Sequence, residues 1–113
     1  MDLYKEIITR IKKSESSFKI VLNKPNLSII NPKGKNLKLT EKEFMLIELL
    51  LSNNEKPLSK KFILYSVWGI DQERVSSLNT RVLETLISRI RKKIRSVKME
   101  ISITKNKNGY MLL

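Results

Sequence analysis

The side chains best equipped for chemistry are the basic ones in the last third of the chain. Residues 79–113 carry nine lysines and arginines against two acids, a local charge of +7 within a total of +12. Arginine presents a planar fork of N–H donors that matches phosphate oxygens and the guanine edge. A basic surface of this density favours a polyanion as partner. A basic face that is only solvated is the alternative.

Other chemistry is excluded by composition. The chain has no cysteine and no histidine. Disulfides, thiolate ligands, thiol nucleophiles, the usual general base and the commonest metal ligand are therefore missing. The eleven carboxylates form no suggestive cluster. We expect no enzyme activity, no metal and no cofactor. No signal peptide and no apolar run of spanning length is present, so we expect a cytoplasmic protein.

A helix over residues 78–97 must position these cations. At about 100° per residue, one side of it is aliphatic and the opposite side is basic and polar. The aliphatic side holds Leu83, Ile87, Ile90, Ile94 and Val97. The opposite side holds Arg81, Thr85, Ser88, Lys92 and Arg95, with Arg89 and Arg91 on the flanks. Such a helix can dock on a core and present its cations outward.

The rest of the chain predicts a small α+β domain. Residues 1–13 have helical spacing and 14–17 form a linker, whereas 18–39 alternate with period two and predict about three antiparallel strands. Thr40 and Glu43 form a capping-box pattern that starts a helix through residue 51. A second helix follows Pro57, with Ser59 as N-cap and Gly69 as its stop. Residues 99–113 predict a hairpin with an Asn/Gly-containing tip. We expect an N-terminal segment, 1–17, and one domain, 18–113.

Four stretches of this sequence resemble the effector domain of OmpR/PhoB-type response regulators. Residues 39–47 read LTEKEFMLI, like the family's LTxxEFxLL, and 67–69 read VWG as in the family. Residues 81–94, RVLETLISRIRKKI, are similar to a recognition helix of the form RTLDxHISRLRKKL. Ile103, Thr104, Gly109, Tyr110 and Leu112 match the pattern IxT…GYxL in outline. The resemblance covers residues 18–113 and implies a winged helix-turn-helix: an N-terminal antiparallel sheet, a three-helix core and a C-terminal β-hairpin wing, here with an extra N-terminal helix.

The resemblance also implies roles for individual residues in binding double-stranded DNA. A recognition helix over about 79–95 would enter the major groove, and a wing over about 101–113 would touch the flanking backbone or minor groove. Base contacts are assigned to Arg89 above all, with Arg81, Thr85 and Ser88 beside it. Phosphate contacts are assigned to Trp68, Arg91, Lys92, Arg95, Thr104, Lys105, Asn106 and Lys107. Without the family, Trp68 and Tyr110 would be packing residues, and residues 91–93 would only solvate a helix C-terminus.

The sequence departs from the family in ways that bear on function. We expect no receiver domain and therefore no aspartyl phosphorylation, and the helix near Leu3 to Ile11 would pack on the domain or mediate a homodimer. The loop over 69–78 is longer than in the family and could meet RNA polymerase through Asp71 and Glu73, or could be plain solvent-exposed loop. Asn106 and Lys107 stand where the family's wing has glycine and arginine, and Leu86 replaces a common histidine.

Three functions remain open on the sequence alone. The first is a sequence-specific transcriptional regulator, bacterial in type and located on the nucleoid, whose subunits bind head to tail on direct repeats. The second is a nucleoid-associated architectural protein that binds duplex DNA with little sequence preference. The third is a module that binds polymerase or another regulator. RNA is a weaker partner because aromatic residues are few.

Overall fold

The computed structural model describes residues 20–53 and 56–113. The predicted N-terminal helix, its linker and the segment 1–17 lie outside these residues, as does Phe18. The described chain runs from a three-stranded sheet through three helices to a hairpin, in the predicted order. None of its helices is long and apolar enough to cross a membrane.

The N-terminal sheet is antiparallel, with strands β1 (Val21–Asn23), β2 (Ser28–Ile30) and β3 (Asn36–Lys38) in that order. Leu22 pairs with Ile29 and Ile29 with Leu37, so buried residues from all three strands align on one face. Asn31 closes the second hairpin, because its Oδ1 accepts from the Lys33 and Lys35 amides at 3.0 and 2.8 Å. Gly34, at φ +81°, completes the turn. The sheet and the turn were both predicted.

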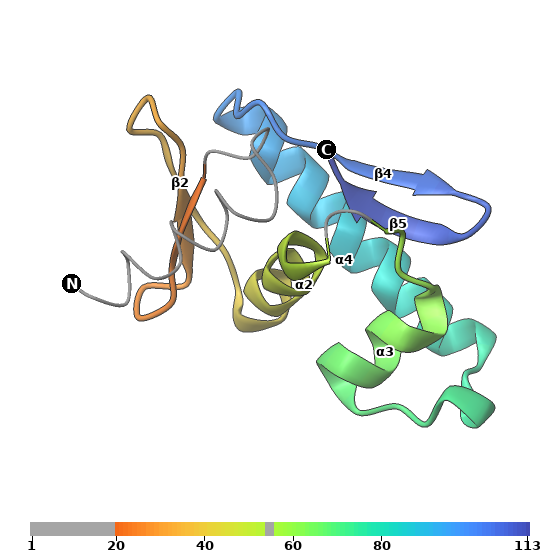
Figure 1. Cartoon of the computed structure of the whole chain (residues 1–113). Helices are drawn as coiled ribbons and strands as arrows, with labels where there is room; N and C mark the ends of the chain where they lie inside the picture. Colours follow the sequence, from red (N-terminus) through yellow and green to blue (C-terminus); the bar gives the residue numbers. More distant parts are fainter. Residues whose placement is uncertain (1–19, 54–55) are drawn as a thin grey trace.

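Helix α2 (Glu41–Ser52) forms the centre of the molecule. Phe44, Leu46, Ile47 and Leu50 are at most 1% exposed, as expected for a helix that is apolar on most sides. The capping box is present: Glu43 N–H donates to Thr40 Oγ1 at 3.3 Å and Thr40 N–H to Glu43 Oε1 at 2.8 Å. Figure 1 shows the N-terminal sheet on one side of α2 and the C-terminal hairpin on the other.

Helices α3 (Lys60–Trp68) and α4 (Ser77–Ser96) complete the core. Ser59 caps α3 by accepting from the Phe62 amide, and Gly69 ends it in the left-handed conformation at φ +71°. A short 3₁₀ turn, η1 (Gln72–Arg74), lies in the connection to α4. Helix α4 packs on both α2 and α3 and runs across the molecule from the sheet side to the far end of α3 (Figure 1).

The C-terminal hairpin consists of β4 (Ile103–Asn106) and β5 (Gly109–Leu112), joined by a two-residue turn. It is more than a two-stranded ribbon, because Leu58 N–H donates to Tyr110 O at 2.8 Å and Tyr110 N–H to Leu58 O at 2.9 Å. The segment that leads into α3 therefore pairs with β5 on the side away from β4. The sequence did not predict this pairing.

Candidate nucleic-acid interface

Helix α4 begins two residues before the predicted recognition helix. Ser76 is its N-cap: Ser76 Oγ accepts from the Asn79 amide at 3.2 Å, and the Ser76 amide donates to Asn79 Oδ1 at 2.9 Å. This is a capping box with asparagine in the place of the usual Glu or Gln. The cap fixes the first turn of α4, where the predicted base contacts begin.

The buried side of α4 is the predicted one. Leu83, Ile87, Ile90 and Ile94 are at most 5% exposed, and Val97 is half-buried against the core. Leu86, at 9% exposed, joins this side, so the residue that replaces the family's histidine packs inward. The helix is therefore fixed by its aliphatic stripe and its opposite face is turned away from the core.

The opposite face carries the predicted base-contacting residues. Arg81, Thr85, Ser88 and Arg89 are all exposed, as are Lys92 and Arg95. Within residues 20–53 and 56–113, the side chains of Arg81 and Arg89 take part in no hydrogen bond or ion pair, so both guanidiniums are free to meet a ligand. Glu84 is the acid on this part of the helix, and Lys60 of α3 lies 3.4 Å from its Oε2. That contact offsets the negative charge beside the cations.

Arg91 makes a contact that the sequence did not predict. Its Nε and Nη2 donate to the Ile103 carbonyl oxygen at 3.1 and 2.7 Å, and its side chain is half-buried. The assignment of Arg91 to a DNA phosphate stays a prediction; in the structure its guanidinium also clamps the first strand of the hairpin to α4. The residue spacing held no sign of this contact, because the partner is a backbone oxygen twelve positions further along.

Lys93 forms a second tie that the sequence did not show. Its Nζ lies 2.6 Å from Glu43 Oε1, and Glu43 is 1% exposed. The carboxylate thus caps α2 and holds the last turns of α4 at the same time. A lysine that could have been one more surface cation is part of the packing between α2 and α4.

The two faces of the hairpin divide its predicted DNA contacts. Lys105 is paired with Tyr110, and its Nζ lies 5.8 Å from the centre of that ring. Because side chains alternate along a strand, Thr104 and Asn106 lie on the other face. Thr104 is half-buried and Asn106 and Lys107 are exposed. The four predicted contacts therefore do not form one surface: Lys105 faces the Tyr110 side, Thr104 and Asn106 the opposite side, and Lys107 the tip.

Tyr110 is a packing residue, as the alternative interpretation expected. Its ring is 3% exposed. Burial raises the pKa of the phenol above its usual value near 10.0; nearby Lys60 and Arg91 oppose the rise and Glu84 adds to it. The phenol is therefore neutral at physiological pH. Tyr110 packs beneath the hairpin and adds no charge there.

Trp68 lies at the end of α3, half-buried and packed against the core. In the described part of the chain its indole N–H has no hydrogen-bond acceptor. Lys42 Nζ donates to the neighbouring Val67 carbonyl at 3.0 Å and so satisfies one of the free carbonyls at this helix end. Trp68 is thus a core residue whose one polar group remains available.

The segment over residues 69–78, predicted to be a loop, is exposed along most of its length, and its last two residues already belong to α4. Asp71 caps η1 by accepting from the Glu73 amide at 3.0 Å, and Arg74 Nε lies 4.0 Å from Asp71 Oδ2. Two carboxylates are therefore presented to solvent next to the start of α4.

Two exposed aliphatic residues on α4 were missed by the sequence interpretation. Leu78 is 65% and Val82 45% exposed, on a helix whose other outward residues are polar or basic. The signal was present in the periodicity, since both fall outside the predicted aliphatic stripe.

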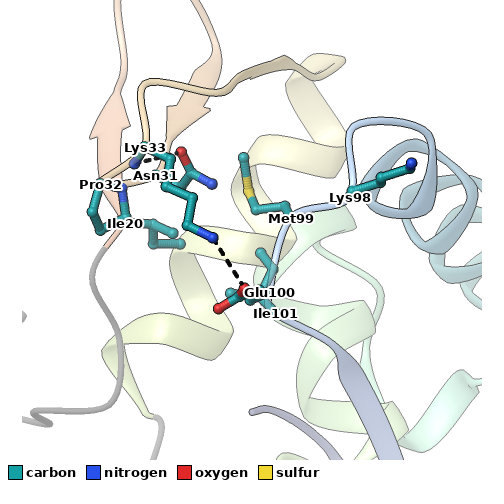
Figure 2. A pocket seen from close by; sticks show the side chains of 8 residues that line it. All are labelled: Ile20, Asn31, Pro32, Lys33, Lys98, Met99, Glu100 and Ile101. Atoms are coloured by element: carbon teal, nitrogen blue, oxygen red, sulfur yellow. Dashed lines mark hydrogen bonds and ion pairs between the residues drawn. The ribbon is translucent and has the colours of Figure 1, made fainter.

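A small pocket lies elsewhere, between the N-terminal sheet and the connection from α4 to β4. It is lined by Ile20 and residues 31–33 on one side and by residues 98–101 on the other, with Lys33 Nζ 3.5 Å from Glu100 Oε1 (Figure 2). None of the predicted site residues lines it. No group of three or more acidic side chains suited to a metal ion occurs in residues 20–53 and 56–113.

Comparison with known families supplies the context for this surface. The profile of the family described as "Transcriptional regulatory protein, C terminal" matches residues 34–112, which span β3 to β5. The chain belongs to this family. The match confirms the resemblance to OmpR/PhoB-type effector domains.

Individual relatives agree with this assignment. A probable transcriptional regulator ycf27 of Galdieria sulphuraria is 43% identical over 77 residues, which cover 66% of this chain and 29% of the relative. The transcriptional regulatory protein DltR of Streptococcus agalactiae is 36% identical over 84 residues, which cover 74% and 36% respectively. The chain therefore spans about a third of the length of these curated relatives.

The solved structures give the same fold. The DNA-binding domain of Bacillus subtilis CssR superposes with a TM-score of 0.64 and 27% identity, over 84% of this chain and 100% of that domain. The predicted winged helix, with its N-terminal sheet, three helices and C-terminal wing, is thereby confirmed.

Proposed function

We propose that this chain binds double-stranded DNA as a sequence-specific transcriptional regulator. Helix α4 enters the major groove and the wing lies on the flanking backbone or minor groove. The observation that carries the proposal is that α4 docks by its aliphatic side while Arg81 and Arg89 stay exposed and unpaired within the described residues. The major groove is wide enough for one helix, and arginine can bind guanine O6 and N7 together. The fold shared with the CssR DNA-binding domain supports it.

Within this proposal the side chains divide by task. Arg89 is the main base reader, with Arg81, Thr85 and Ser88 beside it. Lys92 and Arg95 contact phosphates from α4, and Trp68 does so through its indole N–H. The wing's contacts split by face, with Lys105 and Lys107 directed at the backbone and Thr104 and Asn106 on the outer side. Arg91 holds the wing through two of its five N–H groups and can direct the remaining N–H groups at a phosphate.

The test compares two α4 residues on a selected and a random duplex. Arg89→Ala should lower affinity for the selected site by about 1–3 kcal/mol and change affinity for random DNA little. Lys92→Ala should weaken both duplexes alike and reduce the salt slope by about 1. Lys38→Ala is the matched control, since Lys38 is an exposed lysine on β3, outside the proposed interface.

The selection itself separates the alternatives. An enriched motif among random duplexes supports the regulator. A flat result with strong binding favours the architectural protein, and failure to bind any duplex at about 50 mM salt favours the protein-interaction module, since non-specific cationic binding is strong there. Equal effects of Arg89→Ala and Lys92→Ala on every duplex would contradict the base-reading assignment.

Two protein contacts belong to the same proposal. The exposed carboxylates of Asp71 and Glu73 in the loop over 69–78 are suited to a basic patch on RNA polymerase. Charge reversal at both should reduce transcription activation without lowering DNA affinity.

Two copies would bind head to tail on direct repeats about 10 bp apart. The stoichiometry of the shifted complex measures how many copies are bound. A regulator acting in this way resides on the nucleoid, in the cytoplasm, with residues 18–113 as its DNA-binding unit and 1–17 as a separate segment.

A further inference from the structure

The outer surface of α4 carries two large aliphatic side chains that nothing in the described chain covers. Leu78 is 65% and Val82 45% exposed. Both residues lie among cations and hydroxyls, where aliphatic groups gain nothing from water. On the helix proposed to bind DNA, this pair offers apolar contact area to a ligand.

Helical spacing places this pair in line with the main base reader. Residues 78, 82, 85 and 89 are separated by four, three and four positions, so they form one row along α4. This row runs beside the row that contains Arg81 and Ser88. If α4 brings Arg89 to base edges, it therefore also brings Val82 to the floor of the same groove, at a position nearer the N-terminus of the helix.

The major groove has one apolar group that such a row can meet. Thymine carries a C5 methyl there, and the other bases offer only hydrogen-bonding edges at the corresponding positions. Burial of a methyl against an aliphatic side chain is favourable, whereas a guanidinium or a carboxylate cannot gain from it.

We propose that Val82 reads a thymine methyl group, with Leu78 packing beside it toward the helix N-terminus. This specificity rests on the proposed function. Val82 and Arg89 are seven positions apart, which corresponds to about 10 Å of helix, or about three base pairs. The thymine therefore lies about three base pairs from the guanine that Arg89 contacts.

The experiment removes one thymine methyl group from the DNA and, separately, shortens the Val82 side chain that would contact it. In the selected duplex each thymine is replaced singly by deoxyuridine, which lacks only the C5 methyl. For the wild-type chain, replacement at one thymine about three base pairs from the Arg89-dependent guanine should lower affinity about three- to fivefold. In Val82→Ala the same replacement should change affinity by less than about 1.5-fold, because the methyl has no partner left.

The variants keep the fold intact. Val82 is half-exposed and alanine is the better helix former, so Val82→Ala does not weaken α4. Leu113→Ala is the matched control: Leu113 is 59% exposed, aliphatic and outside α4, and this variant should retain the full sensitivity to deoxyuridine.

The outcomes distinguish failure of the methyl contact from failure of the proposed function. If the wild-type chain selects no motif, the proposed function fails and the methyl contact fails with it. If a motif is selected but no deoxyuridine replacement matters, or Val82→Ala stays as sensitive as the wild type, the methyl contact is overturned and the regulator stands. A loss of self-association in Val82→Ala at unchanged deoxyuridine sensitivity would also overturn it and assign the pair to a protein contact.

Discussion

Arg91 donates two N–H groups of its guanidinium to a single carbonyl oxygen of the wing. A lysine at this position would keep the positive charge but could not donate two N–H groups from a planar guanidinium to the same oxygen. We expect Arg91→Lys to lower the free energy of unfolding by about 1–2 kcal/mol, because hydrogen bonds from charged groups contribute about that much. The wing amides from 103 to 112 should also exchange faster with solvent. Urea unfolding and hydrogen exchange measure the two effects.

The control for Arg91 is Arg95→Lys on the same helix, where the side chain is exposed. It should leave unfolding and wing exchange unchanged. Wing exchange that is equally slow in Arg91→Lys would mean that the clamp does not hold the hairpin.

Lys93 and Glu43 form a partly buried ion pair whose members are not equally accessible. The Lys93 side chain is 36% exposed and the Glu43 side chain 2%. Lys93→Met leaves a buried carboxylate without its cation, so we expect unfolding to become easier by about 2–3 kcal/mol, below the range for fully buried pairs. Thermal or urea unfolding measures it.

The double variant Lys93→Met with Glu43→Gln should recover most of that loss, because the neutral amide oxygen still accepts from the Thr40 backbone N–H. If the second substitution deepens the loss, the carboxylate is stabilised by something other than Lys93.

At the residue scale the sequence predicted exposure better than contacts. The outward position of Arg81 and Arg89 followed from helical periodicity alone, and the structure confirms it. The engagement of Arg91 with Ile103 and of Lys93 with Glu43 could not be predicted, because a tertiary contact leaves no periodic trace. The exposure of Val82 was also predictable, because an aliphatic residue outside the buried stripe of a helix is itself a signal.

Among the elements, the wing depends on a glycine with no room for a side chain. Gly109 has φ +137°, and a Cβ there would lie 2.0 Å from the Leu58 carbonyl oxygen. Gly109→Ala must break the pairing of Leu58 with Tyr110 or move the wing. We expect a loss of about 3 kcal/mol or more in unfolding free energy, from the clash and the backbone strain together. Chemical denaturation and the amide signals of Leu58 and Tyr110 test it.

Gly34→Ala provides the comparison. Gly34 also has a positive φ, +81°, but nothing lies within 4 Å of its Cβ position. Strain alone should then reduce stability by about 1–2 kcal/mol. Equal losses in the two variants would show that the approach of Leu58 is unimportant.

The order and type of the elements were predictable, whereas their additional pairings were not. The three-stranded sheet, the caps at Thr40 and Ser59 and the stop at Gly69 all follow from local chemistry. The start of α4 was placed late because Asn79 is an unusual partner in a capping box. Its end is also atypical: Lys98 adopts φ +54°, where glycine is usual, and the Met99 amide donates to Ile94 O at 3.2 Å. Neither Lys98 nor the isolated bridge at Leu58 carries a recognisable sequence signal.

For the whole molecule, charge should act in opposite directions on folding and on binding. The net charge of +12 repels itself in the compact state, and salt screens that repulsion. We expect the unfolding free energy to rise by a few tenths to about 1 kcal/mol between 10 and 150 mM NaCl. DNA affinity should fall steeply over the same range, as counterion release requires. Urea unfolding and duplex titration on one preparation measure both.

If stability instead falls with salt, attraction within pairs such as Lys93 and Glu43 outweighs the overall repulsion. The interface proposal would survive that result, but the account of the chain as a self-repelling polycation would not.

The pairing of Leu58 with Tyr110 has a consequence for the thermodynamics of recognition. The entry to α3, the wing and α4 are joined by backbone hydrogen bonds and by the Arg91 clamp, so the two parts that would touch DNA are already fixed in mutual orientation. A protein preorganised in this way gives up little conformational entropy on association. Its selectivity among operators should then depend on how far each duplex deforms to meet a rigid template.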